Sequence, residues 1–420
     1  MTSRTARTVG GVDRRSFLAG AAAGALLAAP RPVRAAPARV VVVGGGWGGL
    51  GAVRALAGRP GIELVLLEPN PAFVSCPLSI HYIVGERPFS DFEHGYATID
   101  ALGVRRIREA AVAIDRDRRE VATASARIPY DFLVLSPGVE YVEEAIAGFA
   151  QARDRLPVGF RPFEQHAVKA LVDRFLSEGG TFAIAVPKPP YRCPPAPYER
   201  ACLVAEQIKK RGTKGKVVIA DANPRPLPPP IAEPILEAMR TTYAGLVEYL
   251  PDHEVKAVNF EKGALDCGVV DVPFTHANIV PPMRAPRLLR EAGLGERWAA
   301  VRLPDFRAQG DERIWIVGDA AGTPLPKSGH VAFNAGAVAA RAILRRIAGE
   351  PEPAAAPTEL PAGICFAAVT RDRAIMIAVE SSFVPGEGAK SRFHVDPAPT
   401  RESSEAAMNW GRSMWQSMLG

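Results

Sequence analysis

Short, uninterrupted apolar runs recur along the chain and alternate with longer amphipathic stretches. Runs of valine, isoleucine and leucine without polar alternation are typical of strands buried on both faces of a parallel sheet. Segments dominated by such apolar runs lie at 39–43, 62–68, 132–138, 181–186, 217–221 and 313–317, and most of them begin or end on a polar residue. Helical periodicity begins at Leu50 and recurs at 167–176, 198–211 and 331–346. The alternation predicts an α/β protein.

The pattern divides the chain into two α/β units. Residues 38–150 form the first unit, in which a meander is appended to a β-α-β core, and residues 151–276 form the second. Residues 277–350 return to the first unit with one strand and one long helix. A C-terminal region follows at 351–420, and its first residues are a proline- and alanine-rich linker.

Two further segments have an apolar or proline-rich composition. Proline fits neither a helix interior nor a central strand, so 223–230 is predicted to be a surface loop, the alternative being a polyproline ligand. The tail 406–419 carries several large apolar side chains, and we interpret its Trp410 as a core residue, the alternative being that it lines a substrate chamber.

A glycine-rich loop follows the first strand. Gly44, Gly46 and Gly49 have the spacing that lets a pyrophosphate approach a helix N-terminus, where free N–H groups attract the anion. Glu68 ends the next strand about twenty residues further on, where an acid accepts hydrogen bonds from the adenosine ribose. The alternative for Glu68 is an exposed acid at a strand end. With the strand, helix and acid in place, the loop predicts a dinucleotide site.

A second loop specifies FAD rather than NAD. Gly318 and Asp319 follow the strand at 313–317, and an acid at this position can accept from the ribityl hydroxyls of FAD. Lys327 precedes the helix that comes next, where positive potential would stabilise a reduced flavin. A solvated loop lysine is the equal alternative for Lys327.

The second unit has no comparable fingerprint. Its first strand runs into 187–197, where six of eleven residues are proline. Proline lacks the N–H donors that a pyrophosphate needs. Cys193 lies in this segment instead. We therefore expect electrons to enter from a sulfur substrate rather than from NAD(P)H.

The N-terminus has the features of an export signal. Arg14 and Arg15 precede an apolar run at 19–29 that is too short to span a bilayer, and small residues follow near Ala35. Residues 1–35 are therefore predicted to be a twin-arginine signal peptide that directs the protein to the periplasm, with a retained anchor as the alternative. No transmembrane segment is expected in the mature chain.

Most of the net positive charge of the chain lies in this leader. The leader holds six arginines and one acidic residue, so it accounts for five of the six net positive charges of the chain. The mature protein is close to neutral and has no basic stripe interleaved with aromatic residues. We therefore expect no nucleic-acid partner.

The cysteines and histidines show no metal-binding spacing. The five cysteines form no CxxC pair, so neither a zinc nor an iron–sulfur site is predicted. The chain also lacks CxxCH, which means that any haem belongs to another subunit.

Taken together, these motifs resemble the flavoprotein subunit of flavocytochrome c sulfide dehydrogenase and, more distantly, sulfide:quinone oxidoreductases. The resemblance covers essentially the whole mature chain and is most specific at 67–79, 191–200, 318–319 and 326–329. It implies a glutathione-reductase-like α/β fold with two Rossmann-type, three-layer domains and a C-terminal interface domain. The second of these domains has lost NAD.

The resemblance also assigns roles to individual residues. Cys76 falls where the family attaches FAD covalently, although its context is poorer in tyrosine than the family pattern; the alternative is an inert buried thiol. Cys193 and Cys365 match the family's redox-active disulfide, which hydrosulfide attacks by thiol–disulfide exchange. A purely structural bridge is the alternative for this pair. Glu199 matches a glutamate beside that disulfide, either as a proton acceptor or as a favourable first-turn acid.

The electron acceptor implied by the resemblance is a small c-type cytochrome subunit. One alternative is sulfide:quinone reduction at a membrane surface, with the tail 406–419 dipping into the lipid. The other is a non-catalytic flavoprotein that exchanges disulfides with a sulfur-carrier protein.

Overall fold

A seven-stranded sheet forms the centre of the first α/β region in the computed structural model, which describes residue 1 and residues 36–268 and 270–420. The sheet order is β19-β20-β21-β9-β1-β2-β5. Five neighbouring strands are parallel: β21 (Ile314–Ile316), β9 (Phe132–Leu135), β1 (Ala38–Val43), β2 (Ile62–Leu67) and β5 (Arg105–Ile107). β20 (Arg307–Ala308) and β19 (Val301–Arg302) extend the sheet antiparallel. Four of the segments predicted as strands, at 39–43, 62–68, 132–138 and 313–317, therefore correspond to buried strands of this sheet.

Two helices pack against each other beside this sheet almost backbone to backbone. They are α2 (Trp47–Leu56) and α9 (Gly329–Ile347). A Cβ on Gly51 would lie 2.0 Å from the carbonyl oxygen of Phe333, and one on Gly336 would lie 2.0 Å from that of Gly48. Glycine is therefore required at this crossing, which holds the N-termini of both helices at one cavity.

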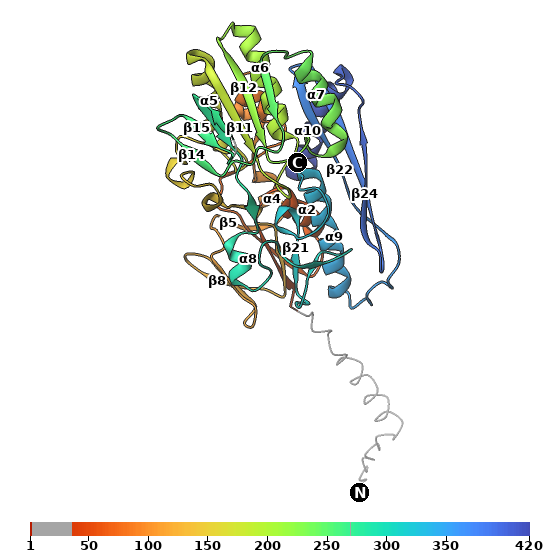
Figure 1. Cartoon of the computed structure of the whole chain (residues 1–420). Coiled ribbons are helices and arrows are strands. Elements are labelled where there is room, and N and C mark those ends of the chain that lie inside the picture. Colours follow the sequence, from red (N-terminus) through yellow and green to blue (C-terminus); the bar gives the residue numbers. More distant parts are fainter. Residues whose placement is uncertain (2–35, 269) are drawn as a thin grey trace. The chain divides into compact units, whose positions relative to one another are not determined.

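The second α/β region has a four-stranded parallel sheet in the order β13-β12-β11-β17. Its strands are β11 (Gly180–Val186), β12 (Gly215–Asp221), β13 (Val247–Leu250) and β17 (His276–Ile279). The helices of this region are α5 (Glu164–Glu178), α6 (Ala196–Arg211) and α7 (Ala232–Arg240). Figure 1 shows α6 beside β11 and β12, with α7 on the far side of α6.

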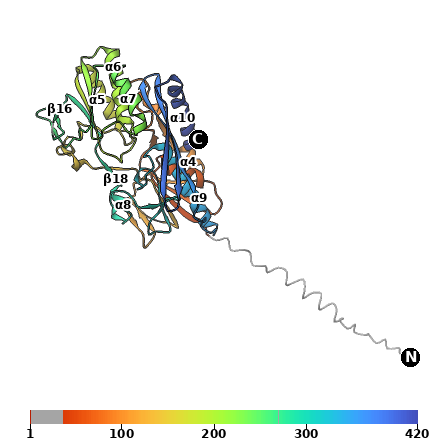
Figure 2. The same cartoon turned by 45° about the vertical axis from the view of Figure 1, so that its right-hand side comes forward.

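The C-terminal region is an antiparallel sheet followed by a helix. β22 (Thr358–Thr370), β23 (Arg373–Val384) and β24 (Gly388–Val395) pair in sequence order, and α10 (Arg401–Leu419) follows them. β22 packs against both α9 and α6, and Figures 1 and 2 both show the blue strands running alongside α9. The C-terminal sheet thus contacts both α/β regions.

Shorter elements complete the chain. The remaining strands are β3 (Ala72–Val74), β4 (Glu93–Gly95), β6 (Ala113–Asp115), β7 (Glu120–Ala122), β8 (Arg127–Pro129), β10 (Glu140–Tyr141), β14 (Ala257–Asn259), β15 (Ala264–Asp266), β16 (Asp271–Pro273) and β18 (Met283–Arg284). The remaining α-helices are α3 (Ile80–Ile83), α4 (Ala97–Ala101) and α8 (Arg287–Glu291). Single 3₁₀ turns lie at Phe89–Asp91, Glu143–Ala145, Ala150–Ala152, Pro229–Ile231 and Gly318–Ala320.

Residues 38–420 form one compact unit. The export signal predicted at 1–35 lies outside the described residues, apart from Met1. Within the part of the chain that the structure describes, no helix is long and apolar enough to cross a bilayer. The same residues contain no cluster of His, Cys, Asp or Glu that could hold a metal ion.

Candidate functional site: a nucleotide cradle beside a two-cysteine cavity

Two adjoining cavities lie where the α/β regions and the C-terminal sheet meet. A cavity of about 340 Å³ is lined by the glycine loop, Glu68 and Asp319. A second cavity of about 300 Å³ is lined by Cys193, Cys365 and Glu199. The residues common to both linings are Cys76, Arg192 and Gly329. The structure therefore places nearly all of the predicted site residues around one continuous region.

The glycines of the first loop have different structural roles. Gly44 has a φ of +95°, and a Cβ there would lie 2.3 Å from the carbonyl oxygen of Ser136. A Cβ on Gly49 would lie 1.8 Å from the carbonyl oxygen of Gly44, so Gly49 permits close packing of the helix and does not line the cavity. Gly46 lines the cavity and has no atom within 4 Å of its ideal Cβ position. Its open side leaves room for a ligand to approach the start of α2.

Glu68 is buried, with 6% of its surface exposed, and lines the same cavity. Its Oε2 accepts from the Gly45 amide at 2.6 Å, and its Oε1 accepts from the backbone and side-chain nitrogens of Asn70 at 2.8 and 2.6 Å. The carboxylate is thus held in place at the end of β2 and is not the exposed acid of the alternative interpretation.

Asp319 has an unsatisfied acceptor. Its Oδ2 lies 3.2 Å from Nε of Arg192, but its Oδ1 is buried without a hydrogen-bond partner among the described residues. Asp319 and Gly318 both line the glycine-loop cavity. A buried acceptor without a donor is costly, and a ligand hydroxyl would satisfy it. The site therefore fits the sugar-like chain of FAD.

Lys327 is buried rather than solvated. Its Nζ donates to the carbonyl oxygens of Asp319 and Ala321 at 2.6 and 3.1 Å, and it lies 3.8 Å from the ring centroid of Trp298. Burial lowers the pKa of its ammonium group to about 8. The backbone N–H of Cys193 donates to the carbonyl oxygen of Lys327 at 2.9 Å. Lys327 thus connects the Asp319 loop to the cysteine segment.

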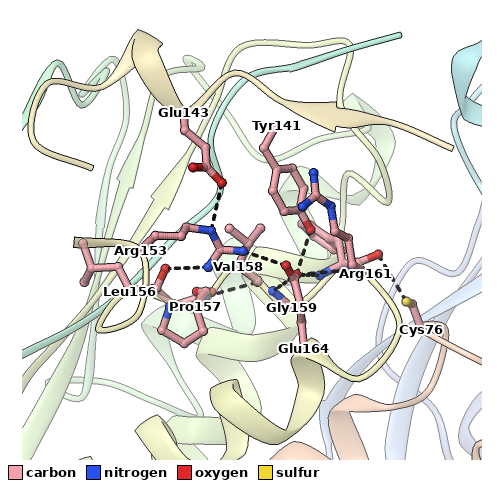
Figure 3. Close-up of polar contacts among 12 residues, drawn as sticks. Cys76, Tyr141, Glu143, Arg153, Leu156, Pro157, Val158, Gly159, Arg161 and Glu164 are labelled. Carbon is pink, nitrogen blue, oxygen red and sulfur yellow. Dashed lines mark hydrogen bonds and ion pairs between the residues drawn. The ribbon is translucent and has the colours of Figure 1, made fainter. Parts of the chain in front are cut away.

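Cys76 lies in the loop between β3 and α3, at the junction of the two cavities. Its Sγ donates to the carbonyl oxygen of Phe160 at 3.4 Å (Figure 3). The same sulfur accepts from Nε2 of Gln165 at 3.2 Å. Burial raises the pKa of the thiol, while the charge of Arg192 opposes that increase.

The loop that presents the Phe160 carbonyl is held by Glu164. Its Oε2 accepts from the backbone N–H groups of residues 159–161 at 3.0 to 3.2 Å and from the hydroxyl of Tyr141 at 2.8 Å. Arg153 donates to Oε1 of Glu164 at 2.6 Å (Figure 3). The surroundings of Cys76 are therefore fixed by several charge-assisted hydrogen bonds.

Cys193 and Cys365 line the second cavity from different elements. Cys193 lies in the proline-rich segment with a φ of +51°, and Cys365 lies on β22 opposite Ile377 of β23. Both carry free thiols in this structure. Burial raises the pKa of both thiols, that of Cys365 to about 12, and the negative charge of Glu199 raises them further. A thiolate on Cys365 would raise the pKa of Cys193 further, so the fold brings the two sulfurs into one electrostatic environment.

Glu199 is a buried carboxyl in the first turn of α6 and lines the cysteine cavity. Burial raises its pKa to about 7, although a hydrogen bond from the Ala368 amide at 2.9 Å favours the ionised form. A carboxyl with such a pKa can both accept and release a proton near neutrality.

Three features of the cysteine cavity were missed or misread from the sequence. Arg192, which lies in the stretch 191–200 but was assigned no role, lines both cavities. Trp410 is only partly buried: it packs against the core, stacks on Trp47 with ring centroids 5.8 Å apart and also lines the cavity. Pro228, in the segment predicted as a surface loop, also lines the cavity; the segment is a loop, but it is folded against the site.

The second α/β region keeps an acid at the position equivalent to Glu68. Asp221 ends β12, and β12 pairs with β11 as β2 pairs with β1. Its carboxylate is fully buried and accepts from the hydroxyls of Tyr198 and Tyr249 at 2.7 and 2.9 Å and from the amide of Asn223 at 2.9 Å. These donors occupy the oxygens that a nucleotide ribose would need.

Comparison with known proteins agrees with this geometry. The glycine loop, the paired acids and the fold define a flavoprotein of the pyridine nucleotide-disulphide oxidoreductase class, whose profile matches residues 38–160. Residues 168–281 match the profile of the central part of the sulfide dehydrogenase [flavocytochrome c] flavoprotein chain. The flavoprotein chain of that enzyme from Chlorobaculum thiosulfatiphilum is 52% identical over 42 residues, which are 10% of this chain and 88% of that sequence. The chain belongs to the family of sulfide dehydrogenase [flavocytochrome c] flavoprotein chains.

Solved structures confirm the predicted fold class. The sulfide:quinone oxidoreductase of Aquifex aeolicus superposes with a TM-score of 0.76 at 20% identity, covering 91% of each chain. A NAD-dependent persulfide reductase from A. fulgidus superposes with a TM-score of 0.60 at 16% identity, covering 89% of this chain and 77% of that one.

Proposed function

We propose that this protein oxidises hydrosulfide to zero-valent sulfur or a polysulfide and passes the electrons through FAD to a c-type cytochrome subunit. The observation that carries the proposal is the placement of Cys193 and Cys365 in a buried cavity that shares Cys76 and Arg192 with the nucleotide cradle. The family to which the chain belongs supports the choice of sulfide as substrate.

In this proposal Cys193 and Cys365 form a disulfide in the resting enzyme. Hydrosulfide attacks one sulfur, which breaks the disulfide and leaves a persulfide on one cysteine and a thiolate on the other. The disulfide then re-forms with loss of zero-valent sulfur, one proton and two electrons. Bound FAD supplies the two-electron acceptor. Glu199, whose pKa burial raises to about 7, accepts the proton.

The cofactor in this proposal is FAD attached through Cys76. Gly44, Gly46 and the start of α2 would hold the pyrophosphate, Glu68 the adenosine ribose and Asp319 the ribityl hydroxyls. Gly49 contributes by letting α2 pack close to the loop. A covalent link would retain the cofactor outside the cell. In the second region, the carboxylate of Asp221 already accepts hydrogen bonds from the hydroxyls of Tyr198 and Tyr249. Because these donors occupy the oxygens that a nucleotide ribose would need, they support a sulfur donor over NAD(P)H.

The placement of α10 favours a cytochrome over a membrane quinone as acceptor. Met414, Trp415, Met418 and Leu419 are all buried against the rest of the protein. An apolar face that is already packed inside the protein has little area left to bury in lipid.

Anaerobic titration with sulfide tests the proposal. We expect the flavin absorbance of the mature protein to bleach with sulfide, and the Cys193→Ser and Cys365→Ser variants to lose this response. Cys267→Ser is the matched control, because Cys267 does not line the cysteine cavity. Equal bleaching in all variants would remove the disulfide from the mechanism, and no bleaching in any would reject sulfide as the donor.

A second measurement distinguishes a cytochrome acceptor from a quinone acceptor, and both from a non-catalytic thiol-exchange partner. The proposed enzyme reduces a c-type cytochrome with sulfide alone. Reduction of a quinone but not of cytochrome would favour the membrane enzyme, and failure with both would favour a thiol-exchange partner. The proposed periplasmic location is tested by replacing Arg14 and Arg15 with lysine, which should leave the precursor in the cytoplasm.

A further inference from the structure

The sulfur of Cys76 is held between two buried residues. Its Sγ accepts from Nε2 of Gln165 at 3.2 Å and donates to the carbonyl oxygen of Phe160 at 3.4 Å. Gln165 is fully buried in the first turn of α5, and Phe160 is also buried. Since Cys76 lines both cavities, these two contacts fix the thiol at their junction.

The amide of Gln165 is not fully satisfied by the protein. Its Oε1 is buried without a hydrogen-bond partner among the described residues. An unsatisfied buried acceptor is costly, and an apolar side chain of similar size would occupy this position without that cost. Packing alone therefore does not account for a glutamine here, and its one contact with a reactive group is the donation from Nε2 to the sulfur of Cys76.

The charges around Cys76 act in both directions. Burial raises the pKa of the thiol, whereas the charge of Arg192 and the hydrogen bond from Gln165 lower it. The thiolate, not the thiol, is the nucleophile, so these two groups favour the reactive form. The other titratable groups whose charges act on this thiol or respond to it are Glu164, Asp319, Arg200 and Cys193.

We propose that Gln165 promotes the attachment of FAD to Cys76 by stabilising the thiolate of this cysteine. The inference rests on the proposed function, in which FAD is held through Cys76. In the attachment, Sγ bonds to the carbon of a flavin ring methyl, and the S–H bond and one C–H bond break. The two electrons of the C–H bond reduce the flavin. One of the two protons stays on the flavin and the other leaves to water, and the cytochrome acceptor or dioxygen then removes the electrons.

The pH dependence of attachment tests this role. FAD is added to the flavin-free protein, and the flavin that stays on the acid-precipitated polypeptide is measured over time. Gln165→Met keeps the length of the side chain but removes the donor. We expect this variant to bind FAD as tightly as wild type but to attach it about tenfold more slowly, the effect of losing one hydrogen bond to a charged group. The midpoint of its pH–rate profile should lie about one pH unit higher.

Alkylation of Cys76 by iodoacetamide before FAD is added measures the thiol directly, and Gln165→Met should show the same higher midpoint. Gln165→Glu provides a second variant in case Gln165→Met does not fold. Its ionised carboxylate opposes a thiolate, so its midpoint should also lie above that of wild type. Gln207→Met is the matched control, because Gln207 is buried on α6 and lines neither cavity.

Equal attachment rates and equal midpoints in wild type and both variants would overturn the role of Gln165. Slower attachment with an unmoved midpoint, or with a matching loss of FAD binding, would also overturn it, because either result would indicate a structural role only. If wild type attaches no FAD, the covalent link itself fails, and the role of Gln165 fails with it. Sulfide oxidation is tested separately, through Cys193 and Cys365.

Discussion

The guanidinium of Arg192 lies 3.2 Å from the carboxylate of Asp319. This ion pair joins the proline-rich segment of the second α/β region to the loop that follows β21 in the first. The two side chains are only 21% and 10% exposed, and Arg192 also donates to the carbonyl oxygen of Phe160, which faces Cys76. One arginine therefore links Asp319, Cys76 and the cysteine segment.

Removal of this arginine should destabilise the protein. In Arg192→Met the carboxylate of Asp319 stays buried without its partner, and breaking such a pair costs about 3–5 kcal/mol. Urea unfolding of the wild type and the variant measures the difference. Arg240→Met is the control, because Arg240 forms exposed pairs with Glu233 and Glu237, and its loss should cost less than about 1 kcal/mol. If the double variant Arg192→Met/Asp319→Asn is no more stable than Arg192→Met, the cost does not come from the unpaired carboxylate.

The buried Glu199 should make stability depend on pH. Because burial raises its pKa from 4.5 to about 7, the folded protein binds this proton more tightly than the unfolded chain. Stability is therefore fully present below pH 4.5 and is lost as the pH rises toward 7. The shift corresponds to about 3 kcal/mol at most.

Glu199→Gln isolates this contribution. The glutamine can still accept the Ala368 N–H but does not ionise, so the variant should gain stability relative to wild type, by up to about 3 kcal/mol, between pH 5 and pH 8. Chemical denaturation across that range provides the measurement. A constant difference between the two proteins would mean that Glu199 titrates normally in the folded state.

Cys76 should hold the flavin after denaturation. In the wild type, acid precipitation should leave yellow flavin on the pelleted polypeptide, whereas Cys76→Ser should release it into the supernatant. Cys267→Ser is the matched control, since Cys267 lies on neither cavity. Release of the flavin from wild type as well would identify Cys76 as an inert thiol at the junction of the cavities.

The sequence predicted those parts of the site that depend on local patterns. The apolar strand at 39–43, the glycine loop and Glu68 lie within one β-α-β unit, so spacing along the chain is enough to relate them. Cys365 was assigned only by family resemblance, because nothing local indicates that β22 packs against α6 beside Cys193.

Other residues could not be identified from the sequence because their partners are distant. Arg192 pairs with Asp319, which lies 127 positions further along the chain. Arg192 falls within the stretch 191–200 that carries the family resemblance, but nothing local indicates this partner. Trp410 has a large apolar side chain of the kind found in protein cores, and only the fold reveals that it stacks on Trp47 at the cavity. Glu86 lies in a short turn without hydrophobic periodicity, so no sequence pattern predicts its pairing with His81.

Two glycines of the first unit allow packing and ligand binding to be separated. Gly51 faces the backbone of α9, and an added Cβ would lie 2.0 Å from the carbonyl oxygen of Phe333. Backbone cannot move away as a flexible side chain can, so Gly51→Ala should destabilise the protein by roughly 1–3 kcal/mol through overpacking. Gly46 has an ordinary negative φ of −79° and no atom within 4 Å of its Cβ position. Gly46→Ala should therefore leave the stability of the flavin-free protein within about 0.5 kcal/mol of wild type.

The same two variants should behave differently toward FAD. A methyl group on Gly46 projects into the space where the pyrophosphate would approach α2, so Gly46→Ala should fold normally but bind FAD at least tenfold more weakly in reconstitution. The methyl group on Gly51 lies at the contact between α2 and α9, so Gly51→Ala should lose stability while the folded fraction still binds FAD. Flavin content per folded chain and the unfolding midpoint, measured on both variants, distinguish the two effects. Normal FAD binding by Gly46→Ala would mean that the cofactor does not approach the helix at this glycine, and the pyrophosphate would then have to be assigned to another part of the cavity.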